Sequence, residues 1–236
     1  MTKEAIILAG GLGTRLRSVV KDVPKPMADI NGKPFLEYLL LNLKKQGIEK
    51  VILSVGYKYE IIKNYFGNSF LDMKILYSIE DKPLGTGGGI RKSLSFVESE
   101  DVFIINGDTI FNIDLSSFFS FHKKKKSALT LALKSMKHFS RYGSVELNKR
   151  GRIIGFKEKG YHKSGLVNGG IYVLAKEVLE DFKVEKPFSF EKDFLEVYYT
   201  TLPFFGTSFE NYFVDIGVPE DYARFKRDAI ALNFLT

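Results

Sequence analysis

The residues best suited to chemistry follow the first apolar run of the chain, in the segment LAGGLGTRL and in the lysine–proline pair after it. Three closely spaced glycines, Gly10, Gly11 and Gly13, let the backbone turn tightly and direct successive amide hydrogens at one point, which suits phosphate oxygens. Arg15 adds a planar, permanently charged guanidinium and Lys25 adds an ammonium. Together these residues predict a site for phosphate groups.

Two familiar glycine-rich loops do not match this segment. A P-loop ends in Gly-Lys-Ser/Thr, which the segment lacks, and the dinucleotide fingerprint requires a glycine where the chain has Leu16. A glycine-rich turn alone is usually only a turn. The phosphate-binding interpretation therefore depends on Arg15 and Lys25 beside the glycines.

The elements that must position these residues alternate through the first half of the chain. Short apolar runs typical of buried strands lie at 5–9, 51–56, 74–78 and 102–106, and helical patterns lie at 34–47, 59–67 and 89–97. This order predicts an α/β fold, a Rossmann-like, doubly wound and mainly parallel sheet with helices on both faces. Ligands should bind at the carboxyl ends of its strands.

The second half has strand-like runs at 128–135, 143–148, 152–158, 169–175 and 211–216, with helices near 176–182, 191–199 and 219–233. We expect these strands to continue the first sheet as a mixed sheet. Because no Pro/Gly/Ser-rich linker or internal repeat separates the halves, residues 1–236 are expected to form a single domain.

Composition excludes several classes of protein. The 236 residues are 44% hydrophobic and 27% charged, which is typical of a folded globular protein and not of a disordered or membrane-spanning one. The sequence has no cysteine and only three scattered histidines, so any metal must be held by carboxylates.

The N-terminus lacks the apolar core and cleavage site of a signal peptide, which predicts a cytoplasmic protein with no membrane partner.

The net charge of +7 permits either nucleic acid or small polyanions as partners. The densest basic run, Lys123–Lys126, follows an amphipathic segment and is best explained as the solvated end of a helix, where cations complement the helix dipole. No basic recognition helix accompanies it. We therefore expect phosphate-bearing small molecules and no nucleic acid.

Several segments together resemble the sugar-phosphate nucleotidylyltransferases. They are GGLGTRL at 10–16, Lys25-Pro26, YSIEDKPLGTGGGI from Tyr77, NGD ending at Asp108, FKEK ending at Lys159, NGGIYVL from Asn168 and DIGVPEDY from Asp215. They occur in the family's order over nearly the whole chain. The resemblance implies the nucleotide-diphospho-sugar transferase fold and a reaction of a nucleoside triphosphate with a sugar 1-phosphate that releases pyrophosphate.

The resemblance also implies roles for individual residues. Arg15 and Lys25 would be catalytic, because they neutralise the phosphates that must approach each other. The nucleotide would be bound by Leu8, Gly10, Gly11, Gly13, Thr14, Arg15, Glu80, Pro83, Gly85, Thr86 and Asp108. The sugar phosphate would be bound by Gly143, Glu158, Lys159 and Asn168. The family often has proline where this chain has Gly160 and alanine where it has Gly169.

Asp108 and Asp215, each at the end of a strand-like run, match the family's pair of magnesium ligands. Mg²⁺ usually takes one or two carboxylates and completes its coordination with phosphate oxygens and water. Either aspartate alone could be a turn or cap residue. As a matched pair they favour a magnesium site.

The combination LGTGGGI and DIGVPEDY is most similar to the guanylyltransferases that act on heptose 1-phosphate for bacterial surface polysaccharide (capsule or lipopolysaccharide). Glu80 supports guanine over uracil, because a carboxylate only accepts hydrogen bonds and guanine offers adjacent N1 and N2 donors. The implied substrates are GTP and D-glycero-α-D-manno-heptose 1-phosphate. Many relatives carry a C-terminal β-helix domain, which is not expected here.

Three alternatives stay open: a mannose-1-phosphate guanylyltransferase, an amino-sugar-1-phosphate uridylyltransferase, and a regulatory homologue that binds nucleotide without turnover. The presence of both aspartates and of Lys25 argues for an enzyme. A homo-oligomer is also left open.

Overall fold

The computed structural model describes residues 1–11, 16, 19–20, 22–182, 184 and 186–231. Its strands are β1 (Glu4–Leu8), β2 (Asp29–Ile30), β3 (Lys33–Pro34), β4 (Lys50–Val55), β5 (Ser69–Phe70), β6 (Met73–Ile79), β7 (Asp101–Asn106), β8 (Thr109–Phe111), β9 (Leu129–Phe139), β10 (Ser144–Leu147), β11 (Ile153–Lys157), β12 (His162–Ala175), β13 (Phe204–Phe209) and β14 (Phe213–Asp215). In this part of the chain, no helix combines the length and apolarity needed to cross a bilayer.

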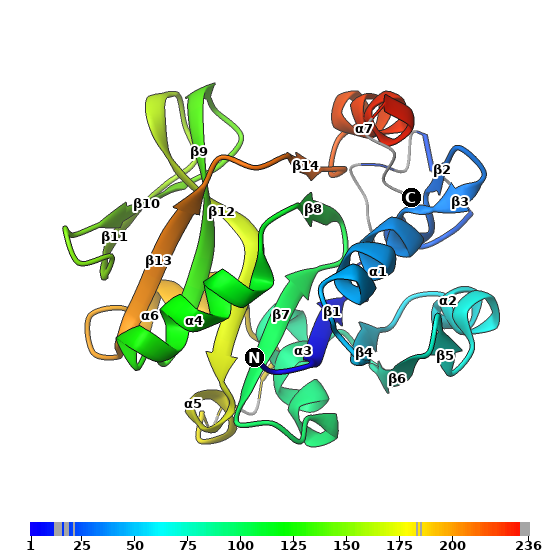
Figure 1. Ribbon diagram of the computed structural model, residues 1–236, viewed down its shortest axis with the longest axis horizontal. Helices are drawn as coiled ribbons and strands as arrows, with labels where there is room; N and C mark the ends of the chain where they lie inside the picture. Colours follow the sequence, from blue (N-terminus) through cyan, green and yellow to red (C-terminus); the bar gives the residue numbers. More distant parts are fainter. Residues whose placement is uncertain (12–15, 17–18, 21, 183, 185, 232–236) are drawn as a thin grey trace.

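A ten-stranded mixed sheet runs through the described residues in the order β11-β10-β12-β7-β1-β4-β6-β5, with β9 paired to β12 and β13 paired to β9 (Figure 1). The central strands β7, β1, β4 and β6 are parallel. Their register places Leu8 beside both Ser54 and Asn106, and Ser54 beside Ser78. The carboxyl ends of these strands therefore lie at one edge of the sheet.

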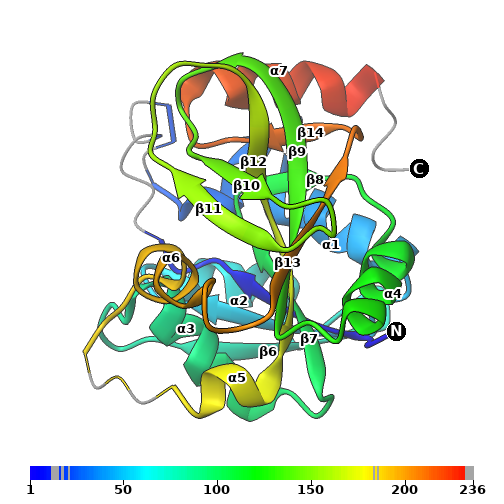
Figure 2. The same cartoon turned by 90° about the vertical axis from the view of Figure 1, so that its left-hand side faces the viewer.

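Helices cover both faces of this sheet, which explains why its central strands are apolar on both sides. The helices are α1 (Phe35–Lys45), α2 (Tyr59–Phe66), α3 (Gly85–Ser93), α4 (Leu115–Lys125), α5 (Lys176–Glu180), α6 (Glu196–Tyr198) and α7 (Pro219–Ala231), with 3₁₀ helices η2 (Lys25–Met27) and η3 (Leu94–Phe96) and a π-helix η4 (Phe190–Leu195). The first core contains residues of α1, α2 and α4, and the second core contains residues of α3, α5 and η4. A third, smaller core joins α1 and α7 to β8 and β14. Figure 2 shows α1 and α4 on one side of the sheet and α3 on the other.

The second half of the sheet curls until it closes on itself. β12 is fourteen residues long and pairs with β7, β9 and β10 along its length. β13 adds to the far side of β9, and it meets the start of β11 through a bridge between Arg152 and Phe205. A further backbone bond joins Gly206 N to Gly151 O at 2.9 Å. The buried residues of these strands, such as Leu133, Val145 and Ile153, belong to the same core as Ile90 of α3 and Phe194 of η4.

The predicted fold class is confirmed, and several elements differ in detail; the strand predicted at 169–175, for example, is the end of β12, which begins at His162. The run NYFVDI forms β14, but β14 pairs with β8 in a separate two-stranded sheet. At the turn after β7, Gly107 passes so close to Leu8 O that a Cβ would lie 2.5 Å from it, and the chain then leaves the main sheet to form β8. β13 was not predicted, and α3 begins at Gly85 instead of Gly89, because a glycine run gives little helix signal.

The first strand is anchored by a buried carboxylate, Glu4. Its oxygens accept hydrogen bonds from the backbone N–H groups of Glu98 and Ser99 at 3.1 and 2.6 Å and from the Ser99 hydroxyl, and Lys50 Nζ lies 2.9 Å away. Burial alone raises the pKa of Glu4, but the bonds from Ser99 and Lys50 outweigh burial and lower this pKa to about 2. The ionised form is therefore the one that stabilises the fold.

We predict that Glu4→Gln lowers the free energy of unfolding by about 3 kcal/mol at pH 7, as expected for a carboxyl whose pKa falls by two to three units on folding. Because the folded pKa lies below the unfolded one, the difference from wild type should persist above pH 5. The difference in the free energy of unfolding should shrink as the pH falls from about 4.5 towards 2. Urea titrations of both proteins at several pH values measure this difference.

Glu49→Gln is the matched control, because Glu49 pairs with Lys3 at an exposed position on the same side of the sheet. Its effect should stay below about 1 kcal/mol. A Glu4→Gln deficit that does not change with pH would contradict the assignment.

Candidate active site

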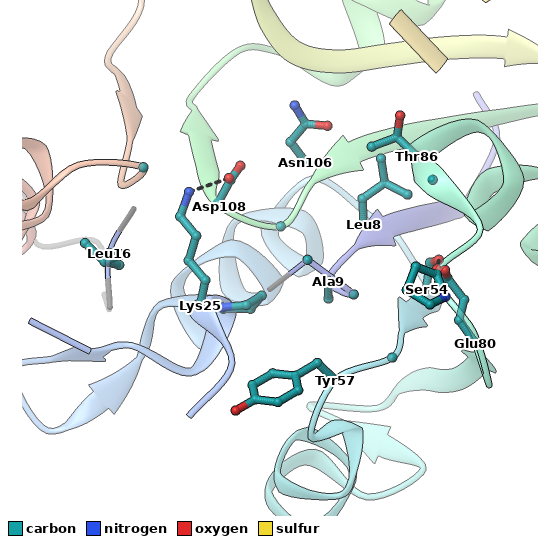
Figure 3. A pocket seen from close by; sticks show the side chains of 18 of the residues that line it. Leu8, Ala9, Leu16, Lys25, Ser54, Tyr57, Glu80, Thr86, Asn106 and Asp108 are labelled. Carbon is teal, nitrogen blue, oxygen red and sulfur yellow. Dashed lines mark hydrogen bonds and ion pairs between the residues drawn. The ribbon is translucent and has the colours of Figure 1, made fainter. Parts of the chain in front are cut away.

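A cavity of about 710 Å³ opens where the parallel strands end. It is lined by the ends of β1, β4, β6 and β7, by the first turn of α3 and by η2 (Figure 3). The residues lining it are Leu8, Ala9, Gly10, Gly11, Leu16, Lys25, Pro26, Ser54, Gly56, Tyr57, Glu80, Asp81, Pro83, Gly85, Thr86, Asn106, Gly107, Asp108, Glu191 and Gly217. The position agrees with the general rule for ligands in open α/β sheets.

One side of this cavity carries a lysine between two aspartates. Lys25 Nζ lies 2.5 Å from Asp108 Oδ2 and 3.6 Å from Asp215 Oδ1, and the lysine side chain is only 10% exposed. Figure 3 shows the Lys25–Asp108 contact. The cluster is a strongly polar, partly desolvated site in which two carboxylates converge on one positive charge.

Pairing of β8 with β14 brings the two aspartates together. Asp215 lies opposite Thr109, the residue after Asp108, and Ile216 N donates to Asp108 O at 3.0 Å. Gly217 N donates to Asp215 Oδ1 at 2.7 Å, which fixes the carboxylate. Residues more than one hundred positions apart in the sequence are thereby held within the reach of one cation.

Glu80 lies at the end of β6, apart from the lysine cluster (Figure 3). Its Oε1 accepts a hydrogen bond from Ser54 Oγ at 3.1 Å and its Oε2 accepts one from Leu84 N at 3.0 Å. A Cβ on Gly89 would lie 2.8 Å from both Glu80 Oε1 and Ser54 Oγ. The glycine run of α3 is therefore what makes room for this carboxylate.

The first turn of α3 also holds the segment that leads into η4. Gly87 N donates to Phe188 O and Phe188 N donates to Leu84 O, both at 3.0 Å. A Cβ on Gly87 would lie 2.1 Å from the Phe188 ring, which is itself buried. Thr86 Oγ1 accepts from Phe190 N at 2.8 Å and donates to Glu191 Oε2 at 2.9 Å. These contacts place Glu191 in the cavity wall.

The structure brings most of the predicted nucleotide residues together. Leu8, Gly10, Gly11, Lys25, Glu80, Pro83, Gly85, Thr86 and Asp108 line the cavity, and Asp215 adjoins it through Lys25. The predictions for Gly13, Thr14 and Arg15 lie outside the described residues.

The predicted sugar residues are less closely gathered. Asn168 donates from Nδ2 to the Tyr172 hydroxyl at 2.8 Å, and that hydroxyl donates to Glu191 Oε1 at 3.4 Å. Gly143 lies just before β10, and Glu158 and Lys159 follow β11. None of the four predicted sugar residues is among those that line the cavity. Gly143 packs against the backbone, where a Cβ would lie 2.6 Å from Lys157 O.

Sequence reasoning missed five polar residues of the cavity, Ser54, Tyr57, Asp81, Asn106 and Glu191. Ser54 and Asn106 interrupt apolar strands near their ends, which is a usable signal. Glu191 lies within a helical pattern and gives no such signal, because only the packing of η4 against α3 turns it towards the cavity.

Comparisons with known proteins agree with this geometry. A family model for nucleotidyl transferases matches residues 4–231. The D-glycero-α-D-manno-heptose 1-phosphate guanylyltransferase of Campylobacter jejuni is 54% identical over 94% of this chain and 98% of its own length. The enzyme of the same name from Aneurinibacillus thermoaerophilus is 52% identical over 95% and 97%. HddC from Yersinia pseudotuberculosis, solved as a complex with GMP-PN, is 39% identical over 95% and 98%, with a TM-score of 0.86.

We predict that Gly87→Ala lowers the free energy of unfolding by about 1 to 3 kcal/mol, because the added methyl group must displace the buried Phe188 ring. Chemical denaturation measures the change. Gly160→Ala is the control, since nothing lies within 4 Å of a Cβ at that exposed position. Equal stability of the two variants would show that α3 does not need a glycine against Phe188.

Proposed function

This chain belongs to the nucleotidyl transferase family, and we propose that it transfers GMP from GTP to D-glycero-α-D-manno-heptose 1-phosphate, giving the GDP-sugar and pyrophosphate. The observation that carries the proposal is a single cavity with an acceptor carboxylate, Glu80, in one part and the Lys25–Asp108–Asp215 cluster in another. Guanine recognition needs an acceptor carboxylate, and phosphate transfer needs a positive charge and ligands for a metal ion. The names of the two relatives and the GMP-PN complex of HddC support the choice of substrates.

Glu80 is proposed to read the base. Ser54 and Leu84 N each donate to a different oxygen of its carboxylate, which fixes the orientation and leaves further acceptor capacity on both oxygens. Guanine N1–H and N2–H can donate to these oxygens side by side. Uracil would direct a carbonyl at one of them, which would leave a desolvated acceptor without a donor.

The reaction forms a bond between a phosphate oxygen of the sugar 1-phosphate and the α-phosphorus of GTP, and it breaks the bond from this phosphorus to the α,β-bridging oxygen. The electron pair leaves with pyrophosphate, so no protein nucleophile is needed. Lys25, with its shielded ammonium, would screen the two approaching phosphates. Backbone amides of Gly10 and Gly11 and the Arg15 guanidinium would hold the triphosphate.

A divalent cation fits the residues of this cluster. Two carboxylates that already converge on one ammonium form an all-oxygen, anionic donor pair of the kind Mg²⁺ prefers. Within the described residues, no group of three or more Asp, Glu, His or Cys is arranged for a metal, so phosphate oxygens and water would complete the coordination. Asp108 and Asp215 would hold the ion, which when bound would neutralise phosphate charge.

The sugar end of the site is assigned to Gly143, Glu158, Lys159 and Asn168, supported by the hydrogen-bond chain from Asn168 to the cavity residue Glu191. Residues 1–236 are proposed to act as one catalytic domain in the cytoplasm, where GTP is available. Nucleic acid and membranes are not proposed as partners.

Replacing Glu80 by Gln should lower kcat/KM for GTP by about 10- to 100-fold and narrow the preference over UTP, because one acceptor oxygen becomes a donor that faces guanine donors. Steady-state release of pyrophosphate with each triphosphate measures this. Asp72→Asn removes a carboxylate charge at an exposed turn away from the cavity wall and should leave the GTP/UTP ratio unchanged. A wild-type preference for UTP would reject guanine recognition.

Chelation by EDTA should abolish turnover, and Mg²⁺ should restore it. Asp215→Asn should raise the Mg²⁺ concentration for half-maximal rate by about tenfold or more, since an anionic ligand is lost while the shape is kept. Asp72→Asn, at an exposed turn with φ +60°, provides the control. An unchanged Mg²⁺ requirement in Asp215→Asn would favour a structural role for this aspartate.

A further inference from the structure

Glu191 is a carboxylate of the cavity wall to which the proposed reaction gives no role. Three hydroxyl groups donate to it. Thr86 Oγ1 and Ser189 Oγ contact its Oε2 at 2.9 and 3.2 Å, and the Tyr172 hydroxyl contacts its Oε1 at 3.4 Å. Complete burial raises the pKa of Tyr172 well above its usual range, so this hydroxyl stays protonated and donates.

The backbone around Glu191 is fixed from two sides. Phe190 and Phe194 of η4 are fully buried in the second core, and the Phe190 ring packs edge-on against Tyr172 with centroids 5.4 Å apart. Phe190 N donates to Thr86 Oγ1 on α3. Glu191 therefore lies on the π-helix η4, which is held between β12 and α3. π-Helical segments often occur at functional sites.

The charge of Glu191 is not neutralised by a neighbour. Among the described residues it has no ion-pair partner, and all its side-chain contacts are neutral hydroxyls. Oε2 already receives two hydrogen bonds, whereas Oε1 receives a single long one from Tyr172. A carboxylate has about four acceptor positions, so Oε1 has capacity for a further donor from the cavity.

We propose that Glu191 Oε1 accepts a hydrogen bond from a hydroxyl of the sugar and so determines which sugar 1-phosphates are used. An uncompensated carboxylate repels phosphate, but it binds hydroxyl groups through short, charge-assisted bonds. Asn168, already assigned to the sugar, orients the Tyr172 hydroxyl that faces the same oxygen. The inference rests on the proposed function, which supplies a polyhydroxylated substrate.

The test compares wild type, Glu191→Gln and the control Glu196→Gln, an exposed carboxylate of the adjoining α6. Initial rates are measured with GTP and the heptose 1-phosphate, then with mannose 1-phosphate and its derivatives that each lack one hydroxyl. We expect Glu191→Gln to raise KM for the sugar phosphate by about 10- to 100-fold, with KM for GTP changed by less than about threefold. Glu196→Gln should match wild type.

The decisive readout is selectivity. The kcat/KM of wild type should be about tenfold or more lower for the derivative that lacks the hydroxyl bound by Glu191 than for the parent sugar. Glu191→Gln should use both sugars about equally well, because this substitution and the missing hydroxyl each remove the same charge-assisted hydrogen bond. Unchanged discrimination against every deoxy sugar, or an equal rise in KM for GTP, would show that Glu191 merely ties η4 to α3. If Glu191→Gln does not fold, Glu191→Asp is tested in the same way, because its side chain is one methylene shorter and its carboxylate lies farther from the sugar.

These results also separate this inference from the proposed function. If wild type prefers another sugar 1-phosphate, the heptose assignment is wrong, and the same comparison on the preferred sugar still tests Glu191. If no sugar 1-phosphate is turned over, both proposals are rejected.

Discussion

One ammonium group joins three segments that are distant in the sequence. Lys25 follows the glycine-rich segment, Asp108 follows β7, and Asp215 ends β14, yet the lysine contacts both carboxylates. Two carboxylates repel each other at this separation unless a cation lies between them. The positions of η2, of the turn after β7 and of the C-terminal end of β14 are consequently coupled through one charge.

Two further carboxylates of the cavity, Glu80 and Glu191, are held in a different way. Glu80 is fixed by a serine hydroxyl and a backbone N–H, and Glu191 by three hydroxyls, so neutral donors orient both groups without cancelling their charge. Each can then accept from a ligand that offers N–H or O–H groups. α3 lies between Glu80 and Glu191. Its Gly89 leaves room for the Glu80 carboxylate, and its Gly87 leaves room for Phe188, which precedes Glu191 in the chain. A single helix turn thereby organises the proposed contacts to the base and to the sugar.

The sequence allowed prediction of the parts of the molecule that depend on local pattern. The buried runs of β1, β4, β6 and β7 have the apolar composition of parallel strands, and Glu80 and Asp108 follow such strands closely enough for their convergence to be expected. Lys25 was predicted from the lysine–proline pair of the family resemblance. What could not be predicted depends on packing between distant segments. The helical start of α3 depends on Phe188, the pairing of β14 with β8 depends on the turn at Gly107, and the orientation of Glu191 depends on the π-turn. None of these has a local sequence signal.

The closure of β9, β10, β11, β12 and β13 also affects how the protein can meet copies of itself. At this end of the sheet, the bridge between Arg152 and Phe205 joins what would otherwise be two open edges. At the opposite end the sheet finishes in β5, which is two residues long and is followed by Leu71 and Asp72, both with positive φ. Open edges are the places where strands of different molecules add to one another and begin aggregation. Among the described residues one open edge is left on that side, because β5 pairs only with Met73 and Lys74 of the seven-residue β6. Self-association by strand addition would there have to use the later part of β6.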